Sequence, residues 1–254
     1  MSRVVIVTGG GRGIGAATAQ LLGAKGYAVC VNYLANRERA DEVVDCITRN
    51  GGRAFAHQAD VSSEADVVRL FDSAEERFGS VTHLVNNAGI LFTQSKLADI
   101  DLERFNQVLK SNVVSCFLCS REAVRRFKSG GAIVNVSSLA SQTGSPFEYV
   151  DYAASKGAMD TLTKGLSREV AASGIRVNAV RPGFIYTEMH ADGGEPQRVD
   201  RLAPQIPMQR GGTAEEVANT IAWLLSDEAS YVTGSFIDVA GGAVTLPVKR
   251  NTIS

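Results

Sequence analysis

Long apolar runs, cysteine and histidine are scarce in this chain of 254 residues, and neither sign of charge is in excess. No apolar run reaches the roughly 20 residues that a membrane-spanning helix needs. The 26 basic and 27 acidic residues leave a net charge of -1, which argues against a surface for nucleic acid or another polyanion. Met1 leads almost directly into a strand-like segment without the architecture of a signal peptide, so we expect a cytoplasmic protein with no membrane partner.

The four cysteines agree with a reducing compartment. Cys116 and Cys119 have the spacing of a redox or zinc motif, but they lie in an apolar helical stretch without a second pair of ligands. We therefore expect all four cysteines to be small core residues. His57, His83 and His190 are scattered, and we predict no metal site.

Short β-branched runs alternate with longer helical segments along the chain. This alternation is typical of a parallel sheet with helices on both faces, and the length suits one α/β domain. The seven predicted strands are Val4 to Thr8, Ala28 to Asn32, Arg53 to Gln58, His83 to Asn86, Ala132 to Val136, Arg176 to Val180 and Ser235 to Val239.

Helix starts and stops separate these strands. Ser63 with Asp66, and Thr213 with Glu216, have the spacing of capping boxes, in which a hydroxyl and a carboxylate satisfy free backbone donors. Glycines that we expect where helices stop are Gly51, Gly79 and Gly174. Helices are also predicted from Asn112 to Lys128 and from Tyr152 to Ser173.

The segment 187–212 breaks this rhythm, because it is rich in glycine, proline and charge. We expect a long loop or short helices there, and we interpret the segment as a substrate lid. Its polar side chains indicate a polar substrate such as a sugar or polyol, although any exposed loop of this composition would look the same. They are Glu188, His190, Asp192, Arg198 and Arg201.

Tyr152 and Lys156 are four residues apart in a predicted helix and so share one of its faces. A free tyrosine titrates near about 10. Using it as an acid or base near neutrality needs a positive charge beside it, which Lys156 is placed to supply. The same spacing also occurs by chance on solvated helix edges.

Gly9, Gly13 and Gly15 lie between a predicted strand and a predicted helix. Their missing side chains let the backbone approach a pyrophosphate, and the helix N-terminus offers unpaired N–H groups. The spacing of three residues and then one differs from the common dinucleotide fingerprint. Its position directly after the first strand favours cofactor binding over a plain tight turn.

Four motifs together resemble the classical short-chain dehydrogenase/reductase family, over nearly the whole chain from Arg3 to Gly242. The resemblance implies a Rossmann-type doubly wound parallel sheet of seven strands in a single domain, residues 1–254, and commonly a homotetramer. The tail from Lys249 to Ser254 lies outside it. In chain order the motifs are Thr8-Gly9-Gly10-Gly11-Arg12-Gly13-Ile14-Gly15, Asn86-Asn87-Ala88-Gly89, Val136-Ser137-Ser138 and Tyr152-Ala153-Ala154-Ser155-Lys156.

The resemblance also implies a chemical site for hydride transfer between a nicotinamide and a carbonyl or alcohol carbon. Tyr152 would be the acid and base, and Lys156 would lower its pKa and hold the nicotinamide ribose. Ser138 would hydrogen-bond the substrate oxygen, with Ser137 as an alternative. Asn112 would hold a water that links Lys156 to solvent.

Cofactor choice depends on the end of the second strand. An acidic residue there would bind both ribose hydroxyls of NAD and repel the extra phosphate of NADP. This chain has Asn32 followed by Tyr33, and neither repels phosphate. Arg12 suits a phosphate, although it could be a solvated loop arginine. We expect NADP, and use of NAD as well stays open.

The resemblance implies further cofactor contacts. Asp60 and Val61 would hold the adenine ring, and the turn at Asn87 would steady the sheet edge beside the ribose. The Pro-Gly turn after the sixth strand would fix the nicotinamide carboxamide. The residues concerned are Ile14, Asp60, Val61, Asn87, Ala88, Gly89, Pro182, Gly183, Ile185 and Thr187.

Three functional hypotheses follow. The first is an NADP(H)-dependent oxidoreductase acting on a polar ketone, sugar or polyol. The second is a reductase of 3-oxoacyl thioesters, for which the basic run from Arg121 to Lys128 could meet an anionic acyl carrier or could simply be a solvated helix face. The third is a dinucleotide-binding sensor without turnover. Known sensors of this kind tend to lose the tyrosine or the lysine, and this chain keeps both.

Overall fold

Valine-rich segments form the strands, because branched side chains pack well on a pleated surface. In the computed structural model, which describes residues 3–128 and 130–243, they form one seven-stranded sheet in the order β3-β2-β1-β4-β5-β6-β7, and every neighbouring pair is parallel. All the predicted strands are confirmed, with small shifts at their ends. They are β1 (Val4–Val7), β2 (Ala28–Tyr33), β3 (Arg53–Gln58), β4 (His83–Asn86), β5 (Gly131–Val136), β6 (Ile175–Pro182) and β7 (Phe236–Val239).

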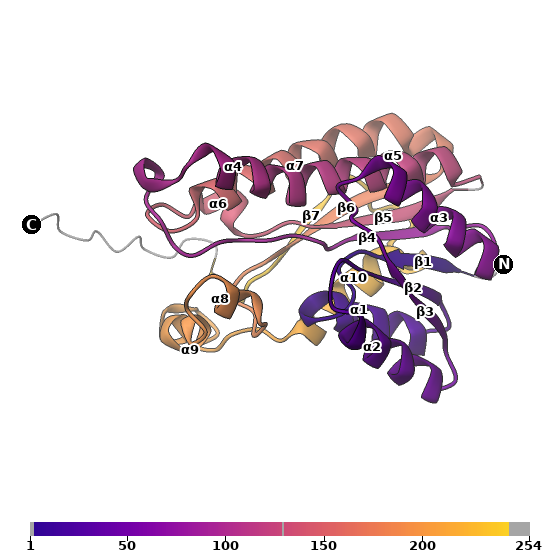
Figure 1. Cartoon of the computed structure of the whole chain (residues 1–254), viewed down its shortest axis with the longest axis horizontal. Helices are drawn as coiled ribbons and strands as arrows, with labels where there is room; N and C mark the ends of the chain where they lie inside the picture. The colour runs from indigo at the N-terminus through magenta and orange to yellow at the C-terminus, as the bar shows by residue number, and fades with distance from the viewer. Residues whose placement is uncertain (1–2, 129, 244–254) are drawn as a thin grey trace, which may run out of the picture.

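Helices cover both faces of the sheet (Figure 1). One layer holds α1 (Gly13–Ala24), α2 (Arg37–Arg49) and α10 (Ala214–Leu225), and the other holds α3 (Glu64–Phe78), α4 (Leu102–Leu109), α5 (Ser115–Arg126) and α7 (Val150–Val170). Val5 and Val7 of β1 pack in one core cluster and Val4 and Ile6 in the other, because successive strand residues point to opposite faces. Two covered faces explain why β1 is uniformly apolar.

The order of the strands places a crevice at the centre of the sheet. The chain builds β1, β2 and β3 outward in one direction and then returns to place β4 on the other side of β1. In a Rossmann-type sheet, ligands bind at the carboxyl ends of the strands where the direction reverses. The glycine-rich turn follows β1 and the Asn-Asn-Ala-Gly turn follows β4, so both motifs meet at this point.

The predicted helix from Asn112 to Lys128 begins earlier and is interrupted. After α4, the π-helical turn Lys110–Val114 contains Asn112 and leads into α5. Such wide turns are rare and frequently lie at functional sites. The other long predicted helix is confirmed as α7, which continues into the 3-10 turn Ala171–Ser173.

The two expected capping boxes differ in outcome. At α10, Glu216 N lies 3.3 Å from Thr213 Oγ1, and Thr213 N lies 2.9 Å from Glu216 Oε2, so this box is confirmed. Helix α3 begins at Glu64 as expected, but the box at Ser63 is wrong, because its side chain makes no cap bond. The Asp66 carboxylate instead accepts hydrogen bonds from Asp60 N at 3.0 Å and Ser63 Oγ at 3.2 Å.

The segment 187–212, here called the lid, forms short helices at one end of the sheet (Figure 1). They are α8 (Met189–Asp192), α9 (Arg198–Leu202) and the 3-10 turn Ala203–Gln205. The other short elements are α6 (Ala140–Thr143) and the 3-10 turns Leu97–Asp99 and Asp227–Ala229. In the part of the chain that the structure describes, no helix combines the length and the apolarity needed to cross a membrane. The tail from Lys249 to Ser254 lies outside the described residues.

Cys30, Cys116 and Cys119 are buried, as expected, and burial raises the pKa of each thiol. Cys46 is only partly buried on α2, so the expectation that all four are core residues is wrong for this one. Over residues 3–128 and 130–243, His, Cys, Asp and Glu form no group of three or more that could hold a metal ion.

The side-chain cap present at Thr213 and absent at Ser63 leads to a prediction about stability. Thr213→Ala removes the side-chain cap of α10 and should lower the free energy of unfolding by about 1 kcal/mol, equivalent to about 2–4 °C in Tm. Ser63→Ala is the matched control, because Ser63 makes no cap bond, and it should cost clearly less. Thermal and urea unfolding measure both variants. Equal losses would contradict the difference between the two helix starts.

Candidate active site

The glycine-rich turn prepares an anion site at the start of α1. Gly9 and Gly13 adopt φ angles of +61° and +51°, which side chains disfavour. Arg12 at the N-cap makes no side-chain cap bond, and the first turn of α1 holds no acidic residue. The first N–H groups of α1 therefore have no side-chain cap, and the positive end of the helix dipole suits a pyrophosphate.

Gly15 has a different role from the one expected of it. A Cβ at this position would lie 2.3 Å from Gly9 O and 2.5 Å from Asn87 Nδ2. Gly15 lines neither of the two cavities described below. Its missing side chain lets α1 pack against the turn instead of admitting the cofactor directly.

A cavity of about 480 Å³ opens at the carboxyl ends of β1 and β4, and we call it the cofactor cavity. Its size and its glycine-rich wall fit part of a dinucleotide. Most of the residues expected to bind cofactor line it, namely Gly9, Arg12, Gly13, Ile14, Asn32, Asp60, Val61, Asn87, Ala88, Gly89 and Thr187.

Asn87 joins the two turns that form the centre of this cavity. Its Nδ2 donates to Thr8 O and Gly9 O, both at 3.0 Å. In return, Thr8 Oγ1 accepts from the backbone N–H groups of Asn87 and Ala88, both at 3.0 Å. The amide therefore holds the turn after β4 against the turn after β1.

Strand β2 ends at Tyr33, one residue later than predicted, which changes the role of Asn32. The Asn32 side chain is buried, and its Oδ1 accepts from Gly9 N at 3.3 Å while its Nδ2 donates to Ala59 O at 3.1 Å. It braces the glycine turn against the next loop. Tyr33, and not Asn32, is the strand-end residue whose type bears on cofactor choice.

Two arginines, Arg12 and Arg39, line the cofactor cavity. Arg12 Nη2 lies 2.5 Å from Asp192 Oδ2, and Arg39 Nη1 lies 3.7 Å from Glu188 Oε1. Sequence reasoning missed Arg39. The available signal was its position in the first turn of the helix after β2, three residues beyond the N-cap Asn36.

Elsewhere on the wall of this cavity, Asp60 uses one carboxylate oxygen within its own loop. Its Oδ1 accepts from Ser62 N at 2.9 Å and from Ser62 Oγ at 2.6 Å. Val61 and Ser62 line the same wall of the cavity. This turn fixes the direction of the Asp60 carboxylate.

A second cavity of about 440 Å³, here called the substrate cavity, adjoins the first. Both cavities are lined by Ile14, Asn87, Thr187 and Met189, so their walls are shared. The predicted chemical residues Ser138, Tyr152 and Lys156 line the substrate cavity, as do the predicted cofactor residues Pro182, Gly183 and Ile185.

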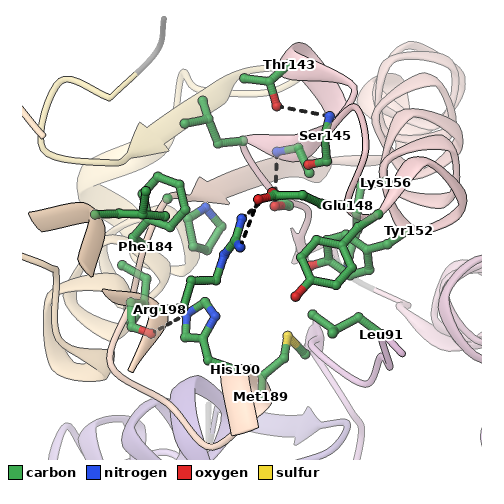
Figure 2. Close-up of a pocket in the computed structure, with 18 of the residues that line it drawn as sticks. Leu91, Thr143, Ser145, Glu148, Tyr152, Lys156, Phe184, Met189, His190 and Arg198 are labelled. Atoms are coloured by element: carbon green, nitrogen blue, oxygen red, sulfur yellow. Dashed lines mark hydrogen bonds and ion pairs between the residues drawn. The ribbon is translucent and has the colours of Figure 1, made fainter. Parts of the chain in front are cut away.

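The Tyr152 hydroxyl points into the substrate cavity (Figure 2). Ser138 is the side chain whose hydrogen bonding acts to lower the pKa of Tyr152. Ser137, the alternative to Ser138, is buried, and its Oγ donates to Lys156 O at 3.4 Å. The geometry therefore favours Ser138 as the hydroxyl beside the phenol.

Burial dominates the electrostatics of Tyr152 and Lys156. Desolvation raises the pKa of Tyr152 to about 12, although hydrogen bonding with Ser138 acts to lower it. Desolvation also lowers the pKa of Lys156 to about 8. The Lys156 ammonium donates to Val136 O at 2.8 Å and lies 5.5 Å from the centre of the Tyr152 ring. The expected lowering of the tyrosine pKa is thus wrong for this structure, because burial disfavours both charged forms.

Asn112 is fully buried and holds the loop after β4. Its Oδ1 accepts from Ile90 N at 2.8 Å, and its Nδ2 donates to Ile90 O and to Ser155 Oγ, both at 3.0 Å. Both amide hydrogens are therefore engaged by protein atoms, and the side chain lines neither cavity, which does not support the expected water-holding role. Ser155, which the sequence reasoning missed, also donates to Tyr152 O at 2.6 Å.

The polar lid residues divide between the two cavities. Glu188 lies on the cofactor side, and Asp192 pairs there with Arg12, whereas His190, Arg198 and Arg201 line the substrate cavity. Sequence order alone could not make this division.

The basic run from Arg121 to Lys128 is partly paired within the subunit. Arg126 lies 2.7 Å from Asp72 and 2.9 Å from Glu75, and Arg121 pairs with Glu64. These carboxylates come from α3, which packs beside α5. Two cations of the run, Arg121 and Arg126, are therefore paired with α3, whereas Arg125 and Lys128 are exposed.

Comparison with known proteins gives consistent matches. Residues 9–244 match a family model described as enoyl-(acyl carrier protein) reductase. The chain is 64% identical over 244 residues to the uncharacterized oxidoreductase YgfF of Escherichia coli, covering 94% of this chain and 99% of that protein. It is 38% identical to glucose 1-dehydrogenase 2 of Bacillus subtilis, covering 96% of each chain.

The chain is also similar to a reductase of known substrate type and to a solved structure. The chain is 38% identical over 244 residues to the 3-oxoacyl-[acyl-carrier-protein] reductase FabG of Staphylococcus aureus, covering 95% of this chain and 98% of that protein. A solved mutant of a short-chain dehydrogenase/reductase of Serratia marcescens superposes with a TM-score of 0.89 at 37% identity, covering 96% of this chain and 98% of that one. The chain therefore belongs to the short-chain dehydrogenase/reductase family and is an NAD(P)-dependent oxidoreductase.

Proposed function

We propose that the protein is an NADP(H)-dependent carbonyl reductase or alcohol dehydrogenase that acts on a polar ketone, sugar or polyol. The observation that carries this proposal is the position of Tyr152, Ser138 and Lys156 in a cavity that shares a wall with the glycine-rich cofactor cavity. A carbonyl group bound beside the Tyr152 phenol would be within reach of these side chains and of a cofactor in the neighbouring cavity.

When bound, the nicotinamide cofactor supplies or accepts the hydride. Tyr152 donates its proton to the carbonyl oxygen in reduction and takes the alcohol proton in oxidation. Its raised pKa keeps the phenol protonated at neutral pH, which suits the reductive direction. Ser138 orients the same oxygen by a hydrogen bond.

The residues that would hold the cofactor follow from the walls of the cavities. The first turn of α1 would bind the pyrophosphate, and Asp60 with Val61 would bind the adenine. Lys156 would hold the nicotinamide ribose, and the Ile185 backbone with Thr187 would fix the carboxamide. The lid, residues 187–212, would close over the substrate.

The preference for NADP is supported by charge. Arg12 and Arg39 line the ribose end of the cofactor cavity, and Tyr33 replaces the acidic residue that would repel a 2′-phosphate. Their present partners are carboxylates on exposed side chains, and such ion pairs contribute little free energy, so a phosphate can replace them. The guanidinium fork suits a phosphate group.

We also propose that the protein forms a homotetramer. Apolar side chains on α4, the π turn and α5 are exposed, with Leu102 at 72%, Val114 at 39% and Phe117 at 45%. Burying them against a second copy of the chain would remove apolar surface from water.

A second candidate function is the reduction of 3-oxoacyl thioesters. It is supported by the similarity to FabG and by the description of the matching family model. Arg121 and Arg126 are already paired with carboxylates of α3, which leaves fewer cations for an acidic carrier, and we therefore place this candidate second. A panel of keto sugars, small ketones and 3-oxoacyl thioesters, assayed by NADPH oxidation, separates the two. Cofactor binding without turnover on the whole panel would favour a sensor.

Tyr152→Phe should lower turnover by at least about a hundredfold, because the acid that protonates the carbonyl oxygen is lost. NADPH binding, measured by fluorescence titration, should change little. Tyr149→Phe is the matched control, since Tyr149 is similarly buried in the same cavity but its hydroxyl contacts Gly193 O at 3.4 Å. A Tyr152→Phe enzyme with the native rate would rule out the assigned mechanism.

The lowered pKa of Lys156 predicts a pH dependence for use of the cofactor. The kcat/KM for NADPH should fall as the pH rises through about 8, because the ammonium loses its proton there. Tyr152 does not contribute to this fall in kcat/KM, since its pKa is raised to about 12. The measurement uses the best carbonyl substrate at saturation from pH 6 to pH 10. A flat profile over that range would contradict the assignment to Lys156.

Arg12→Ala and Arg39→Ala should each lower kcat/KM for NADPH by about tenfold, and NADH should be affected less than about twofold, because only NADPH carries the 2′-phosphate. Arg37→Ala is the control, since Arg37 lies on the same helix, pairs with Asp41 and does not line the cofactor cavity. Parallel steady-state kinetics with both cofactors give the ratio. Equal losses for NADPH and NADH would refute the phosphate contact.

A further inference from the structure

A two-pronged ion pair lies across the substrate cavity from Tyr152 (Figure 2). Arg198 of the lid helix α9 contacts both carboxylate oxygens of Glu148, with Nη1 at 3.1 Å from Oε1 and Nη2 against Oε2. Nη1 also lies 3.0 Å from Oε2 of Glu195. Glu148 and Arg198 line the same cavity as the phenol, so a substrate held at Tyr152 faces this pair.

The burial of Arg198 is unusual for a charged residue. Only 7% of its side chain is exposed, and its guanidinium carbon lies 5.2 Å from the Tyr149 ring centre and 5.6 Å from that of Phe184. A buried ion pair stabilises a fold no better than apolar residues of similar volume. The aromatic and aliphatic wall around it could have been completed without charge, which points to a role in binding.

The loop that presents Glu148 is strained. Ser145 and Phe147 adopt φ angles of +41° and +67°, in the left-handed region that residues other than glycine disfavour. Such conformations persist where the surrounding structure enforces them, and they cluster at ligand sites. Both strained residues directly precede Glu148 in this loop, so the surrounding structure fixes the backbone that leads to it.

The charges around the pair balance. Arg201 Nε lies 2.5 Å from Glu195 Oε1, so two arginines face two glutamates. This group therefore offers no net charge to a phosphate or a carboxylate. It offers guanidinium donors beside carboxylate acceptors, and a hydroxyl group, which both donates and accepts, complements that pattern. The Glu148 side chain remains 33% exposed and so can accept a further hydrogen bond.

His190 adds a further acceptor to this side of the cavity. Its Nε2 lies 3.0 Å from Ile185 O, and because a carbonyl only accepts, Nε2 carries the proton. Burial and then the nearby Arg198 lower the pKa of His190, which favours the neutral ring. In the neutral ring Nδ1 is an acceptor.

We propose that the Arg198–Glu148 pair determines substrate specificity by selecting ketones or alcohols that carry hydroxyl groups away from the reacting carbon. This inference rests on the proposed function and deepens it. Because Arg198 belongs to the lid and Glu148 to the loop before α7, a hydroxylated substrate that bonds to both would contact two walls of the cavity at once.

The test compares two four-carbon ketones, erythrulose and 2-butanone, which differ in their hydroxyl groups. The variant carries Arg198→Met and Glu148→Leu together, so that neither charge stays buried without its partner. We expect kcat/KM for erythrulose to fall by at least about tenfold, mainly through KM, with 2-butanone changed by less than about threefold. Equal losses on both ketones, or no loss on either, would overturn the inference.

A binding measurement separates this inference from the proposed function. Calorimetric titration of threitol into Tyr152→Phe enzyme saturated with NADP⁺ reports recognition without turnover. If threitol binds and the double change abolishes this binding, the inference is supported even when no ketone is reduced. The lack of ketone reduction would then refute only the proposed function. Absence of threitol binding, together with unchanged ketone kinetics, would refute the inference alone. Arg3→Met, which breaks the exposed pair with Asp227 far from both cavities, controls for the general loss of an ion pair.

Discussion

The arrangement of the site depends on the hydrogen bonds of the buried Asn112 side-chain amide. A buried amide is costly unless its donors and acceptor are satisfied, so its bonds to Ile90 and Ser155 fix the loop after β4 against α7. Ser155 is adjacent to Lys156 in sequence, and its hydroxyl also binds the backbone of Tyr152. The π turn that contains Asn112 thus places both chemical side chains relative to the cofactor cavity.

Gly89 shows how closely these parts fit. A Cβ at this position would lie 3.1 Å from Asn112 Oδ1 and 3.6 Å from Lys156 Nζ. The glycine therefore lets the Asn-Asn-Ala-Gly turn approach both side chains. The first of these contacts is tighter than ordinary van der Waals contact, so even one methyl group would push against the amide that orders the site.

The lid is held by ion pairs of two different kinds. On the cofactor side, the Arg12–Asp192 pair is roughly half exposed, and exposed pairs contribute only about 0–1 kcal/mol. On the substrate side, the Arg198–Glu148 pair is largely buried, and removing one partner would leave an uncompensated charge. The segment 187–212 therefore contacts the rest of the chain through an exposed pair beside the cofactor cavity and through a largely buried pair beside the substrate cavity.

The sequence by itself determined the sheet, the order of the motifs and the motif residues that line the two cavities, because β-branched runs, glycine spacing and the spacing of Tyr152 and Lys156 are local patterns. It did not determine which oxygen satisfies which donor. Asp66 turned to the loop before α3 instead of capping it, and the Asn32 side chain braces the glycine-rich turn. The pKa values of Tyr152 and Lys156, the pairing of Arg39 and the buried Arg198–Glu148 contact were decided only by tertiary structure, because desolvation and ion pairing depend on segments that are far apart in the chain and meet only after folding.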